Sequence, residues 1–248
     1  MRPTLRRAAV AALASSSLLF AVACSGSGSD DKPADKKSTA AKPEPEAKPL
    51  TRSQAEAAAL EQKDVPSGWK FDKSMSDTQD GSTVFGLGTA DKKECQPLLD
   101  QIIHSSGSPA AQATVTKSYT KADLGPFLSH GVFSYTTDDA KEAMKNAQPP
   151  ASGCATFTAD FEGDKATFKY SKLDVPAAGD ETLAWRLIAV DDDSGVPMQF
   201  DFAAARVDSA LSVTLLTSVD NKTDISAFKA GFAKGAERVA AAVEANAK

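Results

Sequence analysis

Residues 182–219 read TLAWRLIAVDDDSGVPMQFDFAAARVDSALSVTLLTSV, three apolar stretches separated by two short polar ones. Apolar side chains recur at every second position, as in Leu183, Trp185 and Leu187, which is the period of a strand that buries one face. Both polar stretches are short enough to form hairpins. We therefore predict an antiparallel meander with strands at 182–190, 197–207 and 210–219.

The flanking sequence enlarges this sheet and adds helices. Alternating or apolar segments predict further strands at 83–87, 111–119, 128–136 and 165–173. Helical periodicity predicts helices at 51–62, 92–104, 138–148 and 224–246. Thr51 and Gln54 fit a capping box at the first helix, and Gly231 and Gly235 would let the last helix approach the sheet closely. The fold class predicted is α+β, an antiparallel sheet with helices packed on one face.

The first 23 residues are typical of an export signal, with Arg2, Arg6 and Arg7 ahead of a charge-free run that ends in small residues. Cys24 follows directly, and Ser25 to Gly28 come next. This arrangement resembles the lipobox of bacterial lipoproteins. The resemblance implies cleavage before Cys24 and its acylation, palmitate included, as the mature N-terminus. An incidental cysteine beside an ordinary cleavage site, or an uncleaved anchor, is the alternative, and export could be secretory or twin-arginine.

A low-complexity segment separates this signal from the rest of the chain. Residues 25–49 hold four Pro, five Lys and five acidic residues, and no aromatic, Val, Ile, Leu or Met. Such a segment has too few apolar side chains for their burial to offset the conformational entropy lost on ordering. We therefore predict a disordered tether over 24–49. Residues 50–248 contain no second linker and predict one domain. The expected location is the extracytoplasmic face of the cell membrane, with the lipid on Cys24 as the membrane contact.

The charge of the chain excludes one class of partner. The whole chain has 28 Lys and Arg against 33 Asp and Glu, and removing residues 1–23 would leave 25 basic and 33 acidic residues. Binding to nucleic acid depends on clustered Lys and Arg, so we predict no nucleic-acid partner.

Two cysteines remain once Cys24 is assigned to the lipid. Cys95 and Cys154 in an exported chain predict a disulfide. A metal pair or a reactive thiol is the alternative, although the two residues lack close CxxC spacing.

Few residues are suited to catalysis. His104 ends a predicted helix, where a cation favours the dipole, and His130 lies in a predicted strand, in phase with apolar neighbours. We interpret both as structural, with a general base as the alternative for His130. Asp191 to Asp193 begin like a calcium loop, but Phe202 occupies the twelfth position, where a bidentate acid is needed. No catalytic residue, metal or cofactor is therefore predicted.

Aromatic residues occur at strand and helix periods and are expected in the core. Their alternative role is the lining of an apolar ligand pocket. The residues concerned are Trp69, Trp185, Phe200, Phe202, Phe228 and Phe232.

The order of these features resembles the extracellular sensor domain of PknH-like actinobacterial kinases, which also occurs as free-standing lipoproteins. The features shared are the signal and tether, the run from Val65 to Trp69, Cys95 opening a helix, Cys154 after a short helix, the meander and the Ala-rich last helix. The resemblance implies an α+β domain with a cleft for a small ligand or envelope component and no established catalysis. The chain departs from the family in having one possible disulfide instead of two and in the turn at 208–209, which lacks Gly-Asn. No ligand-binding residue is therefore carried over.

The sequence predicts a membrane-anchored lipoprotein that binds or senses a small ligand or a cell-envelope component, without catalysis. The first alternative is a protein–protein interaction or scaffold module, which would expose an apolar patch. The second is an envelope hydrolase or transferase, which would require His130 or an acidic cluster beside a nucleophile.

Overall fold

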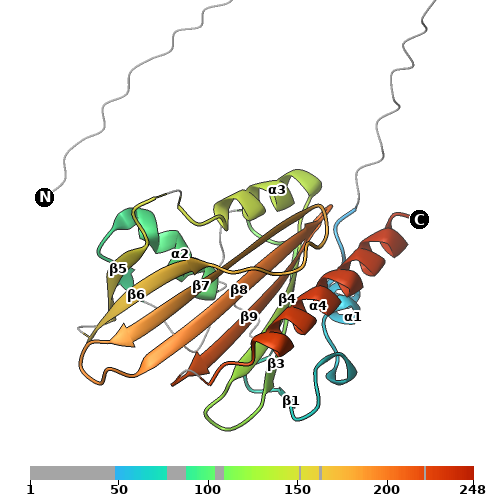
Figure 1. Cartoon of the computed structure of the whole chain (residues 1–248). Helices are drawn as coiled ribbons and strands as arrows, with labels where there is room; N and C mark the ends of the chain where they lie inside the picture. The colour runs from blue at the N-terminus through green and yellow to red at the C-terminus, as the bar shows by residue number, and fades with distance from the viewer. Residues whose placement is uncertain (1–47, 77–87, 104–108, 151, 162–163, 221) are drawn as a thin grey trace, which may run out of the picture. The chain divides into compact units, whose positions relative to one another are not determined.

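The computed structural model describes residues 48–76, 88–103, 109–150, 152–161, 164–220 and 222–248. In this part of the chain nine strands form one antiparallel sheet, in the order β1-β3-β4-β9-β8-β7-β6-β5-β2 (Figure 1). The strands are β1 (Lys70–Asp72), β2 (Thr89–Ala90), β3 (Ala113–Thr120), β4 (Phe127–Ser134), β5 (Thr156–Phe161), β6 (Asp164–Lys172), β7 (Glu181–Asp191), β8 (Pro197–Val207) and β9 (Ala210–Val219). The helices are α1 (Arg52–Ala58), α2 (Gln96–Ile103), α3 (Thr137–Asn146) and α4 (Ile225–Asn246), with 3-10 turns η1 (Gln62–Asp64) and η2 (Lys93–Cys95).

The predicted meander is confirmed as β7, β8 and β9, with strand bounds within one residue of the predicted ones. Trp185 pairs with Phe202, and Phe202 pairs with Leu215 across the next strand. The turn between β8 and β9 places Asp208 at a φ of 48°, a conformation that Asp tolerates better than most residues. The capping box of Thr51 and Gln54 is also confirmed. The predicted strand at 83–87 lies outside the described residues.

The α+β class and the antiparallel sheet are confirmed, but the helices lie on both faces of the sheet. Alternate residues of β8 belong to different cores, because successive side chains of a strand point to opposite faces. Phe200 and Phe202 pack with α2 and α3, whereas Ala203 and Ala205 pack with α4. We call these the α2/α3 face and the α4 face. Because β8 is buried on both sides, the α4 face of this strand carries the small residues Ala203 and Ala205. A strand with one exposed face would carry alternating polar residues at such positions.

Helix α4 lies against β9, β8 and β4 and approaches them closely. A Cβ atom added to Gly235 would collide with the His130 ring, and one added to Gly231 would lie 3.2 Å from Cδ2 of Leu128. The two glycines, one turn apart, therefore set the distance between helix and sheet, as predicted.

Cys95 and Cys154 form a disulfide, as predicted, and both side chains are buried. The bond joins the start of α2 to the chain just before β5. It fixes α2 to the half of the sheet that lies farthest from α4.

The two ends of the sheet differ in character. At one end Asn246 of α4 donates to the carbonyl of Lys48 at 2.8 Å, and the Ser209 hydroxyl donates to the same carbonyl at 3.3 Å. The opposite end carries the β3–β4 and β7–β8 turns, where Leu124 and Val196 are exposed. The predicted tether would thus join the domain at the end opposite to these turns.

The described residues from 48 onward form one compact unit. Among the described residues, no helix is both long and apolar enough to span a membrane.

Candidate functional site

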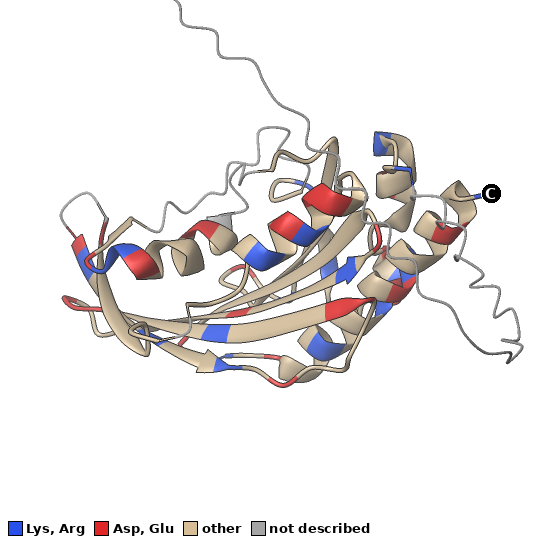
Figure 2. Ribbon diagram, turned by 90° about the horizontal axis from the view of Figure 1, so that it is seen from above, with Lys and Arg blue, Asp and Glu red and all other residues tan. Residues whose placement is uncertain are grey.

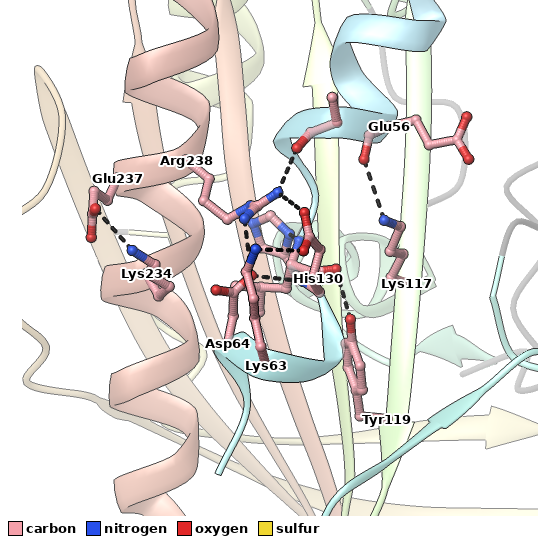
Figure 3. A network of polar contacts seen from close by, with 12 residues as sticks. Glu56, Lys63, Asp64, Lys117, Tyr119, His130, Lys234, Glu237 and Arg238 are labelled. Atoms are coloured by element: carbon pink, nitrogen blue, oxygen red, sulfur yellow. Dashed lines mark hydrogen bonds and ion pairs between the residues drawn. The ribbon is translucent and has the colours of Figure 1, made fainter.

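His130 is completely buried on the α4 face of β4, between the sheet and Gly235 of α4. The backbone N–H of Leu60 donates to its Nδ1 at 3.2 Å (Figure 3). Its Nε2 lies 2.9 Å from the hydroxyl of Ser212. Because Nδ1 accepts a hydrogen bond from the Leu60 N–H, the neutral ring carries its proton on Nε2 and donates a hydrogen bond to the Ser212 hydroxyl. His130 in this state cannot act as a base towards Ser212.

Burial, together with the positive charges of Arg238 and Lys117, lowers the pKa of His130 to about 3. The imidazole is therefore neutral over the physiological range. Together with the burial of Ser212, this neutral state makes His130 a structural residue, in agreement with the interpretation of the sequence.

Tyr119 of β3 completes the attachment of Leu60. Its hydroxyl donates to the Leu60 carbonyl at 2.7 Å, so both backbone groups of Leu60 are bound by side chains of the sheet. Burial raises the pKa of Tyr119 to about 12, with a contribution from the charge of Asp64, which keeps the hydroxyl protonated as a donor.

Arg238 of α4 binds the end of α1 and the segment that follows it (Figure 3). It donates to the carbonyl of Ala57 at 2.6 Å and to Oε1 of Glu61 at 2.7 Å, and its Nη1 lies 3.1 Å from Oδ2 of Asp64. Hydrogen bonds from Lys63 and Arg238 lower the pKa of Glu61 to about 2. Every charged group named here has a partner within the protein, so this network braces the chain from residue 57 to 64.

A second buried polar cluster lies farther along the same face of the sheet. Arg186 of β7 and Asp201 of β8 are directly paired, and the guanidinium donates to both carboxylate oxygens, at 2.5 and 2.9 Å. Gln199 donates to Oδ2 of Asp201 at 2.8 Å and to the hydroxyl of Thr223 at 3.2 Å. Asp201 is fully buried, whereas a quarter of the Arg186 side chain is exposed. The cluster thus holds a carboxylate inside and offers one edge of a guanidinium to solvent.

This edge belongs to a part of the α4 face on β5, β6 and β7, which lie beyond the strands that α4 contacts. Ser171 is directly opposite Arg186, and Lys169 is opposite Ile188 on the same pair of strands. Thr156 of β5 is in turn opposite Lys169. We call these five residues the open strip, and each of them is exposed or half-buried.

The sequence interpretation did not single out Arg186 or Asp201. Both lie inside apolar runs of predicted strands, and their pairing follows only when the register is counted through the 191–196 turn. Two opposite charges at facing positions of adjacent apolar strands were the available signal.

The aromatic residues expected in the core are buried there, but in two separate cores. Trp185 and Phe202 are stacked on the α2/α3 face with ring centroids 4.6 Å apart, while Phe228 and Phe232 pack under α4 on the other face. They cannot line one common pocket. Trp69 belongs to the core under α4.

The remaining predicted residues divide into two groups. Asp191 accepts a hydrogen bond from the Ser194 backbone within its own turn, and no cluster of metal-ligand side chains occurs in the ranges that the structure covers. Cys24 and His104 lie outside the described residues.

Comparison with solved structures shows which fold this chain is similar to. No protein family profile matches the chain, and no curated protein matches it either. The crystal structure of the extracellular domain of PknH from Mycobacterium tuberculosis superposes with a TM-score of 0.52 at 14% sequence identity, over 80% of this chain and 99% of that domain. At this identity the similarity establishes the fold. The resemblance predicted from the order of sequence features is confirmed at that level: this chain has the fold of the PknH extracellular domain.

Proposed function

We propose that the protein is a lipid-anchored, extracytoplasmic module that binds or senses a small ligand or an envelope component without catalysing a reaction. The observation that carries this proposal is the fold shared with the extracellular domain of a kinase, over nearly the whole of that domain. The export signal and Cys24 of the sequence support the same location.

The state of His130 supports a role without catalysis. Both ring nitrogens are engaged by the protein, and the neighbouring Ser212 is buried beneath α4. A general base must reach the proton that it removes from a substrate, and this ring cannot do so without displacing Gly235.

The placement of the N-terminal end of the domain supports anchoring through a tether. The Lys48 carbonyl is bound by Asn246 at the C-terminal end of α4. A chain that arrives there leaves the β3–β4 and β7–β8 turns at the end of the sheet opposite to the attachment point.

Ligand binding is tested by thermal unfolding of residues 25–248 with a panel of envelope lipids, glycans and metabolites. A ligand that binds only the native state raises Tm in proportion to the logarithm of its concentration above Kd. A saturable rise for at least one compound supports the proposal, and a single unchanged transition across the panel contradicts it.

Anchoring is tested separately in the exporting host. The unaltered chain is expected in the membrane fraction with incorporated palmitate label, and the Cys24→Ala chain without label. Recovery of label in the Cys24→Ala chain would contradict acylation at this residue.

An interaction module is the second candidate, because the structure exposes apolar side chains at the turn-bearing end. Leu124 is 84% exposed in the β3–β4 turn, and Phe71 and Val196 are also exposed. A panel without any ligand would favour this candidate, and loss of partner capture on Leu124→Ser would identify the surface.

A further inference from the structure

The open strip combines cations with hydroxyl groups and a short aliphatic surface. Lys169 is diagonal to Arg186 across β6 and β7, a separation that long side chains can bridge towards a common ligand. The hydroxyls of Ser171 and Thr156 lie at the two positions directly opposite these cations. Ile188 is directly opposite Lys169 and is half-buried.

The orientation of Arg186 is fixed from behind. Thr223, Gln199 and Asp201 form a chain of hydrogen bonds that ends on Nε and Nη2 of the guanidinium. No hydrogen bond from Nη1 to a described residue occurs, and this nitrogen is not among the buried unpaired atoms. Such an arrangement presents the remaining N–H groups of an arginine in a defined direction, as bidentate anion recognition requires.

A third cation lies at the same level along the sheet. Gly231 of α4 packs on Leu128, and the register continues from Leu128 through Leu216 and Asp201 to Arg186. Lys229 lies two residues before Gly231, so helical geometry places it about 160° around the axis from Gly231.

The contacts of Arg238 show which side of α4 carries Lys229. Arg238 is seven residues after Gly231 and therefore lies on the same side of the helix as Gly231. It contacts Ala57 and Glu61, on the side of α4 that faces β3 and β4. Lys229 is therefore on the flank of α4 that faces β8, the strand that pairs with β7.

The two lysines, Lys169 and Lys229, have no acidic partner in the described ranges, although acidic groups are abundant. Figure 2 shows acidic and basic residues intermixed along the helices and strands. Many lysines in the described ranges are paired, for example Lys121 with Asp224 at 2.8 Å, but Lys169 and Lys229 have no ion pair there. The carboxylate of Asp201, which is directly opposite Arg186 on β8, is already bound to Arg186. The strip is thus a local excess of positive charge in an acidic protein.

The burial of the Asp201 carboxylate is explained by its effect on Arg186, whose guanidinium it holds in one orientation. Burying an ion pair costs desolvation energy that its mutual attraction often fails to offset, and apolar residues of similar volume commonly serve the fold as well. The alanines beside Asp201 on the same face show that small apolar residues suffice for packing there. A fully buried aspartate at position 201 fixes the orientation of the Arg186 guanidinium, which an apolar residue there would not do.

We propose that Arg186, Lys169 and Lys229 form a binding site for a phosphate group, with the hydroxyls of Ser171 and Thr156 as further donors. This inference rests on the proposed binding function and names its ligand class. Phosphate offers several acceptor oxygens and up to two charges, which matches one guanidinium edge, two ammonium groups and two hydroxyls. The same chemistry is available from a soluble phosphate compound or from a phospholipid headgroup.

The test uses residues 25–248 and two probes. Inorganic pyrophosphate is titrated calorimetrically at constant ionic strength, and vesicles of phosphatidylcholine with and without phosphatidic acid are used in cosedimentation. Binding to pyrophosphate identifies a soluble source of the phosphate, and binding only to phosphatidic acid identifies a headgroup. In either case, Lys169→Gln with Lys229→Gln is expected to raise the apparent Kd at least about tenfold, and added salt to weaken binding.

The matched control removes the same charge from the other face. Lys172 is exposed on the same strand as Lys169 but points to the α2/α3 face, and Lys145 is on α3. Lys172→Gln with Lys145→Gln is expected to leave Kd unchanged. An equal loss in both double variants would show a general charge effect and overturn the assignment, as would no binding of either probe by the unaltered chain.

A further variant separates binding from folding. Arg186→Met with Asp201→Met removes both charges of the pair together and is expected to retain a cooperative unfolding transition while losing phosphate binding. Retained binding in this folded variant would overturn the site. If neither phosphate probe binds but another compound of the panel raises Tm, the binding function stands and only the phosphate assignment fails.

Discussion

The Nδ1 atom of His130 lies 3.2 Å from the backbone nitrogen of Leu60, a residue 70 positions earlier in the chain. Tyr119 binds the carbonyl of the same residue, so a strand histidine and a strand tyrosine together replace the pairing that Leu60 would have in a regular element. This attachment, with Arg238, connects the first segment of the domain to its last helix.

Replacing His130 by leucine should destabilise the domain by about 2–4 kcal/mol, because it leaves the buried N–H of Leu60 without an acceptor and Ser212 without its donor. Tyr119→Phe should cost about 1–2 kcal/mol by leaving the Leu60 carbonyl unpaired. Urea unfolding followed by fluorescence measures both. Tyr135→Phe is the control, since no hydrogen bond of its hydroxyl is found in the described residues, and a loss there equal to that of Tyr119→Phe would contradict the assignment.

The depressed pKa of His130 predicts a defined loss of stability in mild acid. The unfolded chain binds a proton on this ring at pH values near 6.5, whereas the native state does so only near pH 3. Protonation therefore favours the unfolded state, and the stability is complete above pH 6.5 and declines as the pH falls towards 3. The slope approaches about 1.4 kcal/mol per pH unit below 6.5.

The urea midpoint measured between pH 8 and 5 checks this expectation. The carboxylates Glu61 and Asp224, whose pKa values are lowered to about 2, lose their contribution only below about pH 4.5 and do not enter this window. His130→Gln should therefore flatten the profile between pH 6.5 and 5. An unchanged slope in that variant would assign the acid sensitivity to another group.

Gly235→Ala should be strongly destabilising although alanine is the better helix former. In an exposed helix position this substitution would stabilise by up to about 1 kcal/mol. Here the new methyl group would meet the His130 ring, which is held on both nitrogens and cannot retreat, so we expect a loss of about 2–4 kcal/mol. Gly231→Ala meets only the end of the Leu128 side chain and should cost much less. Thermal unfolding of the two variants compares them directly, and equal effects would contradict the close approach at Gly235.

The contrast between predicted and unpredicted features has a physical origin. The meander was predictable because strands β7, β8 and β9 are joined by short turns and carry large apolar residues in register with one buried face. The position of the helices on two faces was not, because Ala203 and Ala205 are small enough to be compatible with either a buried or an exposed face. Strand β1 has only three residues and leaves no periodic signal.

The candidate site was harder to predict than the fold. The spacing of Cys95 and Cys154 excluded a close CxxC motif, and the export context made their disulfide predictable. The Arg186–Asp201 pair depends on the register between two strands, and Lys229 joins it only through the packing of α4 on Leu128. A single sequence does not specify such a contact between distant segments.

The Arg186–Asp201 pair yields a last prediction, which separates its cost from its use. Arg186→Met alone should destabilise by about 3–5 kcal/mol, because it leaves the fully buried carboxylate of Asp201 with only the Gln199 amide as a partner. Arg186→Met with Asp201→Met removes that charge and should recover most of the loss, to within about 1 kcal/mol of the unaltered chain or above it. Urea unfolding of the single and double variants gives the coupling energy through a double-mutant cycle. If the double variant is as unstable as the single one, the pair is required for packing, and the buried aspartate does not serve to orient the guanidinium for a ligand. If stability returns while phosphate binding does not, the pair serves the ligand and not the fold.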